Sequence, residues 1–333
     1  MTVAILKNNA VQIAANGGPE VLEFKQLDVP SGLAPGEILV KNFVAGVNFI
    51  DTNVRKGAMP AKLPLTVGME GAGVVEKVGE GVTDFVPGDK AAYVGVNLHS
   101  YAQYTIISAT KAVKIPASVS FDAAAASMMQ GLTAHYLLTD CYPVKKGDTI
   151  LVHAGAGGVG QLLTQVAAAK GATVITTVGS DAKAEISRAR GAKHVVNYEK
   201  EGWEKEIEEI TGGRGVNAVY DSIGKNTFPS SLHLLRTRGH LVLFGAASGA
   251  PDAIPPLSLG PKSITLIRPM LFHYIEDTQE YRNRAREVFE WVEQGVVAFE
   301  YVRFPLSKAR EAHEALEGRK TVGKILLEVE HDA

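Results

Sequence analysis

The chain contains one cysteine, Cys141, in 333 residues. A single cysteine excludes an internal disulfide and is typical of a reducing compartment, so we expect a cytoplasmic protein. No uninterrupted apolar stretch approaches the roughly 18 residues that a membrane helix needs. The N-terminal residues Met1 to Lys7 also lack the cationic and long apolar segments of a secretory signal. The sequence therefore predicts no membrane partner.

Excess charge of either sign is also lacking. The formal net charge is −2, from 34 basic and 36 acidic residues, and aromatic residues make up only 7% of the chain. Tight binding to nucleic acid or to an anionic membrane needs a basic surface, and single-stranded nucleic acid also needs exposed aromatic side chains. A nucleic-acid partner is therefore not expected. With 46% hydrophobic residues, the chain has the composition and length of a globular protein of two domains.

Glycine, by contrast, is concentrated in a turn after the apolar run at 150–153. Gly155, Gly157 and Gly160 fit the pattern G-x-G-x-x-G. The first glycine permits a tight turn, the second lets the backbone approach a pyrophosphate, and the third lets a helix pack close to a strand. Residues 161–170 read as that helix, whose N-terminal N–H groups would face the anion. The β-branched run at 172–178 completes a βαβ unit, so we expect a dinucleotide site.

The residues after this second strand indicate which dinucleotide binds. An NAD site usually has a carboxylate here, which would repel a 2′-phosphate. This chain instead has Gly179 and Ser180, followed by Lys183, which offer space, a hydroxyl donor and a positive charge. Asp181 could contact a ribose or cap the next helix, and we favour the cap. The local chemistry predicts NADPH.

The coarse pattern of the chain changes near its first third. Short apolar runs separated by glycine and proline predict a β-rich, barrel-like domain, and a helix is expected from about Phe121. From Thr149 onward the pattern alternates between strands and helices. We expect further parallel strands at 194–198, 218–221 and 241–245, an edge strand at 263–268, helices at 203–211 and 278–295, and a terminal strand from Lys324 that returns to the first domain.

This order of domains resembles the medium-chain dehydrogenases and reductases. Zinc alcohol dehydrogenases of that superfamily place a cysteine after an early strand and a histidine in a Gly-His-Glu motif. In the matching stretches this chain has Asn48 and Met69. Catalytic zinc needs three protein ligands, usually thiolate, imidazole or carboxylate, and an amide with a thioether does not supply them. One cysteine also excludes a four-cysteine zinc lobe, so no metal is expected.

More specifically, the chain resembles the quinone oxidoreductase (zeta-crystallin-like) branch. The segments that carry this resemblance are 47–52 with Arg55 and Gly57, 153–160, 197–198, 220–224 and 244–245. The resemblance implies a GroES-like β-rich barrel domain plus a doubly wound Rossmann domain, with the active site in the cleft between them, and often a homodimer. We place the domains at 1–125 and 126–268, with 269–333 returning to the first. The edge strand at 263–268 is our candidate for pairing across a two-fold axis.

The resemblance also implies a set of cofactor contacts at matching positions. The first domain would contribute groups near the nicotinamide, the glycine turn would hold the pyrophosphate, and later strand ends would line the adenine and the nicotinamide ribose. The residues are Asn48, Asp51, Gly157, Gly158, Val159, Gly179, Ser180, Lys183, Tyr198, Ser222, Phe244, Gly245, Leu271, Phe272 and Lys324.

The substrate pocket departs from the pattern of the branch. Asn53 and Met59 align with positions where relatives often have tyrosines, and Gln130 stands where a lysine is frequent. These differences leave the size and preference of a quinone acceptor open. No obligatory acid–base residue is evident, and water can protonate a reduced quinone. We expect Asn48 to orient the substrate or the nicotinamide by hydrogen bonding.

Three functions follow from these observations. The first is reduction of a quinone by NADPH without a metal, in which the protein supplies proximity and a dry site. The second is reduction of an α,β-unsaturated aldehyde, ketone or thioester, with Tyr136 or Tyr93 as a proton donor, although both tyrosines are more simply packing residues. The third is a non-enzymatic role, either crystallin-like or RNA-binding, which the resemblance also suggests and which the charge balance disfavours for RNA.

Overall fold

A computed structural model describes residues 5–30, 32–96, 99–318 and 321–331. The chain forms two compact units, one of residues 1–129, 277–293 and 299–333 and the other of residues 130–276 and 294–298. The chain leaves the first unit after Met129 and re-enters it at Asp277. The sequence interpretation placed these two domain boundaries after residues 125 and 268. The first unit is therefore assembled from distant parts of the chain.

The first unit is built on antiparallel strands. Within the described residues, a seven-stranded sheet has the order β15-β16-β3-β5-β6-β8, with β7 also paired to β3, and a three-stranded sheet has the order β2-β1-β4. The strands are β1 (Ile5–Ile13), β2 (Glu23–Pro30), β3 (Glu37–Val47), β4 (Leu65–Thr66), β5 (Glu70–Val78), β6 (Lys90–Val94), β7 (Tyr104–Ser108), β8 (Ala112–Lys114), β15 (Tyr301–Pro305) and β16 (Lys324–Glu328).

The core of this unit is filled by inward-facing side chains of these strands. Val40, Val75, Tyr93 and Ile107 are buried in one cluster, and the strands around it confirm the expected β-rich domain. Strand β16 pairs antiparallel with β3, with Leu326 opposite Gly46. The predicted return of the C-terminal segment to the first domain is therefore confirmed.

Four α-helices of the first unit lie within the described residues: α1 (Phe49–Arg55), α2 (Phe121–Ala126), α9 (Thr278–Glu293) and α10 (Ala309–Glu317). Ser120 caps α2, because its hydroxyl oxygen accepts the N–H of Ala123. A π-helical stretch at 127–131 continues α2 and links it to α3 (Leu132–Tyr136) of the second unit. The expected helices near Phe121 and at 278–295 are thus both present.

The second unit holds a parallel sheet whose strand order is β11-β10-β9-β12-β13-β14. Counted from β9, this is the 3-2-1-4-5-6 order of doubly wound dinucleotide-binding folds, which confirms the expected Rossmann class. The strands are β9 (Thr149–Val152), β10 (Thr173–Val178), β11 (His194–Asn197), β12 (Val216–Asp221), β13 (Leu235–Leu243) and β14 (Thr265–Ile267).

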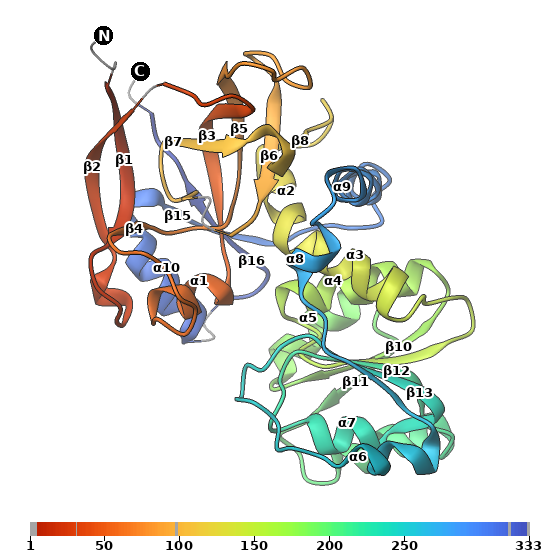
Figure 1. The fold of residues 1–333 in the computed structure, drawn as a ribbon. Helices are drawn as coiled ribbons and strands as arrows, with labels where there is room; N and C mark the ends of the chain where they lie inside the picture. Colours follow the sequence, from red (N-terminus) through yellow and green to blue (C-terminus); the bar gives the residue numbers. More distant parts are fainter. Residues whose placement is uncertain (1–4, 31, 97–98, 319–320, 332–333) are drawn as a thin grey trace. The chain divides into compact units, whose positions relative to one another are not determined.

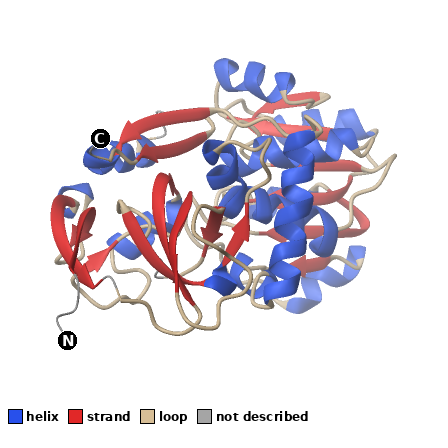
Figure 2. Ribbon diagram, turned by 90° about the horizontal axis from the view of Figure 1, so that it is seen from above, coloured by secondary structure: helices blue, strands red, loops and turns tan. Residues whose placement is uncertain are grey.

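Helices cover both faces of this sheet, as Figure 1 shows with α4 and α5 on one side and α6 and α7 on the other. Figure 2 shows the same alternation of strands and helices by colour. Leu151, Val219 and Leu241 of three strands pack with Ile207 of α6 in the core. The helices of this unit not yet given are α4 (Gly158–Ala169), α5 (Asp181–Ala189), α6 (Trp203–Thr211), α7 (Phe228–His233) and α8 (Leu271–Tyr274).

One strand differs from the sequence interpretation. The run expected at 241–245 belongs to a longer strand, β13, which begins at Leu235 and ends at Leu243. Its first half contains Arg236, Thr237 and Arg238, polar side chains that hide the strand in a search for apolar runs. Because β13 ends at Leu243, Phe244 and Gly245 lie in the loop beyond it. In the described parts of the chain, no helix is both long and apolar enough to span a membrane.

Candidate active site

The glycine turn connects β9 to α4 in the second unit. A Cβ on Gly155 would lie 2.5 Å from the Cβ of Thr176, and one on Gly160 would lie 2.2 Å from the carbonyl oxygen of Ala154. These two glycines are therefore required by packing. Gly157, the N-cap of α4, is exposed, and the nearest atom to its Cβ position is the Ala154 oxygen at 3.1 Å. The middle glycine thus leaves the start of α4 open, with N–H groups that have no intrahelical acceptor.

Gln130 lies against the same turn. Its amide nitrogen is 2.3 Å from the Cβ position of Gly158, and its Oε1 atom is buried without a hydrogen-bond partner among the described residues. The sequence interpretation placed Gln130 in the substrate pocket, but the structure brings it to the glycine turn. Gly158 therefore has a protein neighbour at the position where open space for pyrophosphate was expected. Its backbone N–H, like that of Val159, still belongs to the first turn of α4.

The residues predicted to hold a 2′-phosphate lie together after β10. Ser180 is the N-cap of α5, and its hydroxyl oxygen accepts the N–H of Lys183 at 3.4 Å. The cap is therefore Ser180, and the expected capping role of Asp181 is wrong, because Asp181 is already the first helical residue. The hydroxyl proton of Ser180 is not used by this bond. Within the described residues, the only hydrogen bond of Lys183 outside its own helix is this one, from its backbone N–H.

Tyr198 completes this group. A Cβ on Gly179 would lie 2.7 Å from the hydroxyl oxygen of Tyr198, so the two residues are in contact distance and Gly179 leaves room for the ring. Tyr198 follows β11, whose last residue, Asn197, pairs with Val178 of β10. The carboxyl ends of neighbouring parallel strands thus bring Tyr198 against Gly179, the residue before Ser180.

Ser222 and Gly245 also meet at the carboxyl ends of strands. A Cβ on Gly245 would lie 2.6 Å from the carbonyl oxygen of Ser222. The loop after β12 is fixed by Asp221, whose buried carboxylate accepts the N–H groups of Ile223 at 2.8 Å and Gly224 at 3.0 Å. Three further predicted contacts lie in the same unit: Phe244 is half-buried in the loop after β13, and Leu271, which is buried, and Phe272, which is half-buried, begin α8.

The first unit places Asn48 in a buried polar cluster. Its side-chain oxygen accepts a hydrogen bond from Lys324 Nζ at 2.7 Å, and its side-chain nitrogen donates to Glu70 Oε1 at 2.7 Å. Lys324 also donates to Glu70 and to the carbonyl oxygen of Val47 at 3.2 Å. All three N–H bonds of the ammonium are therefore used inside the unit. Lys324, which the sequence interpretation gave as a cofactor contact, holds the Asn48 amide in place.

Asp51, three residues after Asn48, belongs to a second buried cluster. Its Oδ2 atom accepts the N–H of Asn48 at 2.8 Å and the hydroxyl of Tyr101 at 3.2 Å. Tyr101 contacts His313 Nε2 at 3.1 Å, and His313 Nδ1 lies 3.0 Å from Arg55 Nη1. Burial raises the pKa of Asp51 to about 7 and lowers the pKa of His313 to about 3. The expected pocket residues Asn53 and Met59 lie on and just after α1; Asn53 is exposed and Met59 is half-buried.

Comparison with known proteins agrees with both units. Residues 34–117 match the alcohol dehydrogenase GroES-like domain, and residues 158–292 match the zinc-binding dehydrogenase family. Quinone oxidoreductase 1 of Escherichia coli is 41% identical over 322 residues, which cover 95% of this chain and 98% of that protein. The chain belongs to the quinone oxidoreductase family. It is an oxidoreductase of the medium-chain superfamily.

A solved structure and a second curated protein are also similar to this chain. The crystal structure of the E. coli quinone oxidoreductase complexed with NADPH is 40% identical, covers 96% of this chain and 99% of that one, and superposes with a TM-score of 0.92. A 2-haloacrylate reductase of a Burkholderia species is 40% identical over 328 residues, which cover 96% of this chain and 98% of that protein. The family thus includes proteins named for two kinds of acceptor.

The residues of the chain fit NADPH. The open turn at Gly157 and the N–H groups at the start of α4 suit a pyrophosphate. Ser180 and Lys183 supply a hydroxyl donor and a cation, which together suit a 2′-phosphate. No carboxylate caps α5, so nothing at the cap itself repels the phosphate. The donor set therefore matches the phosphorylated form of the coenzyme.

The positions that would hold zinc in metal-dependent relatives have other partners here. The Asn48 amide is bound between Glu70 and Lys324, and Met69, directly before β5, is buried with 3% of its surface exposed. Across the described residues, no three side chains of His, Cys, Asp or Glu form a group that could hold a metal ion. The buried ammonium of Lys324 is the positive charge of this cluster.

Sequence reasoning missed Glu70, Tyr101 and His313. Glu70 carried one signal, because a charged residue at the start of the apolar run 70–75 needs a buried partner. Tyr101 and His313 carried none, since their partners are far away in the chain. The two tyrosines weighed as proton donors are packing residues: Tyr93 donates to Asn42 at 2.8 Å inside the barrel core, and Tyr136 stacks on Tyr274 with ring centroids 4.2 Å apart.

Proposed function

We propose that this protein is an NADPH-dependent quinone reductase that works without a metal. The observation that carries the proposal is the pair of residues Ser180 and Lys183, which suit the 2′-phosphate of NADPH, together with the open turn at Gly157. Relatives at about 40% identity named quinone oxidoreductase, one of them solved with NADPH, support the same activity. The coenzyme, when bound, supplies the two electrons as a hydride.

The chain's own residues bind, orient and exclude water. Gly157, Gly158 and Val159 present backbone N–H groups to the pyrophosphate, and Gly179, Ser180, Lys183 and Tyr198 hold the phosphorylated adenosine. Ser222, Phe244, Gly245, Leu271 and Phe272 line the rest of the coenzyme. Asn48, held by Lys324 and Glu70, presents its remaining side-chain N–H to the nicotinamide or to an acceptor oxygen. Met59 and Asn53 contribute to the acceptor pocket.

The test is a screen of NADPH oxidation against a panel of quinones, enones, enals and 2-haloacrylates. We expect quinones to give the highest kcat/KM and NADPH to be preferred over NADH. Turnover of enones by a preparation that leaves every quinone unreduced would reject the quinone assignment while keeping the coenzyme assignment.

A second candidate is reduction of an activated carbon–carbon double bond. It is favoured by the 2-haloacrylate reductase, which matches this chain as fully as the quinone oxidoreductases do. Such a reaction needs a proton at the α-carbon, and Tyr93 and Tyr136 do not offer one freely. Burial raises the pKa of each of these two hydroxyls above the ordinary value for tyrosine, and the Tyr93 hydroxyl donates a hydrogen bond to Asn42. We place the quinone first because three relatives at 41–42% identity are named quinone oxidoreductase.

Metal independence, assembly and location are also part of the proposal. The Asn48–Glu70–Lys324 cluster supports a zinc-free enzyme, so we expect elemental analysis to find no stoichiometric zinc and chelators to leave the activity unchanged. We propose a homodimer that pairs through β14, and a cytoplasmic location from the use of a single cysteine. Stoichiometric zinc in a fully active preparation would contradict the first of these.

A further inference from the structure

The two oxygens of Asp51 have different surroundings. Oδ2 accepts two hydrogen bonds, from the Asn48 N–H and the Tyr101 hydroxyl. Oδ1 is buried and has no hydrogen-bond partner among the described residues, although only 1% of the residue is exposed. A buried carboxylate oxygen without a donor is costly, whereas a protonated oxygen that donates to a ligand or water is not. The asymmetry places the acidic proton of Asp51 on Oδ1.

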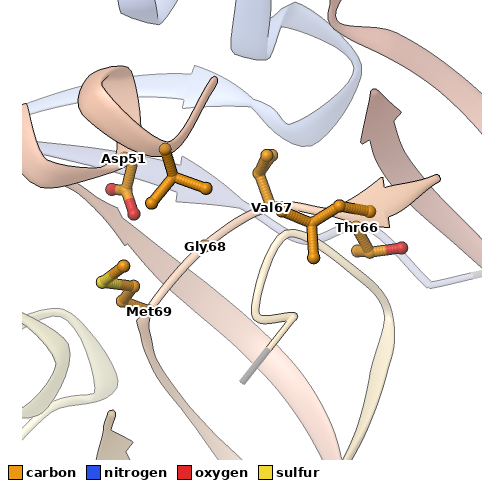
Figure 3. Close-up of a pocket in the computed structure, with 7 residues that line it drawn as sticks. Asp51, Thr66, Val67, Gly68 and Met69 are labelled. Carbon is orange, nitrogen blue, oxygen red and sulfur yellow. The ribbon is translucent and has the colours of Figure 1, made fainter. Parts of the chain in front are cut away.

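Asp51 lines a small cavity in the first unit. Its other lining residues carry no ionisable side chain: Val54, Leu65, Thr66, Val67, Gly68 and Met69. Figure 3 shows the carboxyl group of Asp51 beside Met69 and Val67 in this cavity. The space is sufficient for about one water molecule. In this lining, Asp51 is the titratable group.

The donor directions around Asp51 follow from Arg55. A guanidinium only donates, so the Arg55 Nη1 bond to His313 Nδ1 fixes the histidine as the Nε2–H tautomer. That N–H points to the Tyr101 oxygen, which leaves the Tyr101 hydroxyl to donate to Asp51. The chain of bonds therefore ends at Arg55 and is not a path for protons. It holds Oδ2 as an acceptor and leaves Oδ1 as the atom that gains or loses a proton.

Burial has the largest effect on Asp51 and raises the pKa of its carboxyl. The Asn48 N–H lowers this pKa, the charge of Glu70 in β5 raises it, and the charge of Lys324 in β16 and the Tyr101 hydroxyl lower it. Burial outweighs these effects and brings the pKa to about 7, while His313 stays neutral because burial and Arg55 depress its pKa. A carboxyl with such a pKa exchanges its proton in the neutral range, where a general acid is most effective.

We propose that Asp51 exchanges a proton, through Oδ1, with a water molecule in the cavity beside Met69, and that this proton neutralises the reduced acceptor. The proposal rests on the proposed quinone reductase activity. It assigns to Asp51 a role in proton supply, in addition to the coenzyme contact that the family resemblance implies.

The proton step balances without further reactants. NADPH, when bound, would supply both electrons as a hydride, which would leave the quinone as a hydroquinone anion. The O–H bond of Asp51 then breaks, water passes one proton, and an O–H bond forms on the anion, so that Asp51 is left as a carboxylate. A proton from solvent restores the carboxyl group. Only the hydride transfer changes oxidation states.

The first experiment needs neither coenzyme nor acceptor. Infrared difference spectra of the apoprotein between about pH 5 and about pH 9 should contain the carbonyl band of a protonated, buried carboxyl that is lost near pH 7. The band should be absent in Asp51→Asn, which keeps an acceptor oxygen for Asn48 and Tyr101, and retained in the control variant of exposed Asp252, Asp252→Asn. No such band in the wild type would overturn the proposal.

The second experiment uses the pH dependence of quinone reduction. We expect kcat of the wild type to fall as Asp51 loses its proton, and Asp51→Asn to lower kcat roughly 10²-fold and to remove that fall. Tyr101→Phe removes a donor to the carboxylate, so it should move the midpoint to higher pH, and it tests the idea even if Asp51→Asn misfolds. An unchanged midpoint in Tyr101→Phe, or an unchanged profile in Asp51→Asn, would overturn the role. Absence of quinone turnover in the wild type, with the carboxyl band present, would instead reject the proposed function.

Discussion

At the scale of single residues, our proposal makes the choice between NADPH and NADH depend on one cation, Lys183. Ser180 is engaged in capping α5, whereas Lys183 has no partner among the described residues. A charge-assisted contact to a phosphate is worth roughly 1.5–3 kcal/mol. We predict that Lys183→Ala weakens NADPH by that amount and leaves NADH unchanged, measured by fluorescence titration of both coenzymes. Lys205→Ala, an exposed lysine on α6, serves as the control.

An equal loss for both coenzymes in Lys183→Ala would remove the phosphate assignment. If Lys205→Ala lost as much affinity for NADPH as Lys183→Ala, the effect would come from the net charge of the protein. Either result would require another group to read the 2′-phosphate.

A second residue-scale prediction concerns stability against pH. The pKa of Asp51 is about 7 in the folded state and 3.8 when unperturbed, so the folded protein keeps a proton that the unfolded chain releases. Its contribution to stability is complete below about pH 4 and is lost as pH rises towards 7. We predict that this loss, of up to roughly 4 kcal/mol, disappears from the pH dependence of urea unfolding in Asp51→Asn. Parallel curves for the variant and the wild type would contradict the raised pKa.

The residues that sequence reasoning found are those whose signals are local. Ser180 and Lys183 follow a recognisable strand within one helical turn, so their neighbourhood could be predicted. The contacts of Lys324 with Glu70 and of Arg55 with His313 join residues 254 and 258 positions apart. No pattern along the chain marks such pairs. The contact of Gln130 with Gly158 could not be predicted for the same reason, because it depends on how the helical segment after α2 packs on α4.

At the scale of elements, the strand–turn–helix unit was predicted well because periodicity and glycine spacing agree there. The structure separates the glycines by role, which the motif alone does not. Gly160 is packed against the backbone of Ala154, whereas Gly157 has an ordinary φ of −75° and an open outer side. Beginnings of strands were harder: β13 starts among polar residues, and its limits are set by pairing with β12 rather than by composition.

These roles predict opposite effects of two small substitutions. Gly157→Ala should retain the thermal stability of the wild type and lose affinity for both coenzymes by roughly tenfold or more, because the methyl group occupies the space for the pyrophosphate. Gly160→Ala should lower the melting temperature, since its Cβ would lie 2.2 Å from the Ala154 oxygen. Calorimetry with coenzyme titration distinguishes the two, and unchanged NADPH affinity in Gly157→Ala would mean that the turn does not bind the pyrophosphate.

Strand β16 supplies another prediction at this scale. It inserts Lys324 into the barrel beside Glu70, and both side chains are fully buried. Removing one partner leaves an uncompensated buried charge, which costs about 3–5 kcal/mol. We therefore predict a loss of that size in Lys324→Met by urea unfolding, with much of it regained in Lys324→Met/Glu70→Gln, because the amide oxygen that replaces the carboxylate can still accept the Met129 N–H. A double variant as unstable as the single one would show that the lysine acts through packing alone.

At the scale of the whole molecule, the topology could be predicted because two separate sequence patterns lead to the same arrangement of domains. Alternating strands and helices specify a parallel sheet, and the apolar terminal run of Lys324 to Glu328 needs a neighbour that the parallel sheet does not provide. The structure pairs that run with β3. These patterns could not predict that residues 294–298 belong to the second unit, because those few residues have no periodicity of their own.

The last prediction concerns assembly through β14, the edge of the parallel sheet. Within the described residues, β14 pairs only with β13, so its other side presents unpaired backbone groups, and 36% of Leu266 is exposed there. Such an edge invites pairing with a second copy across a two-fold axis. We predict that Leu266→Lys converts a dimer to a monomer in light scattering after size-exclusion chromatography, while the NADPH affinity is retained. Leu257→Lys, at a residue that is 88% exposed outside the strand, should leave the mass unchanged. A dimer that survives Leu266→Lys and dissociates in Leu257→Lys would place the interface on the loop instead of the strand edge.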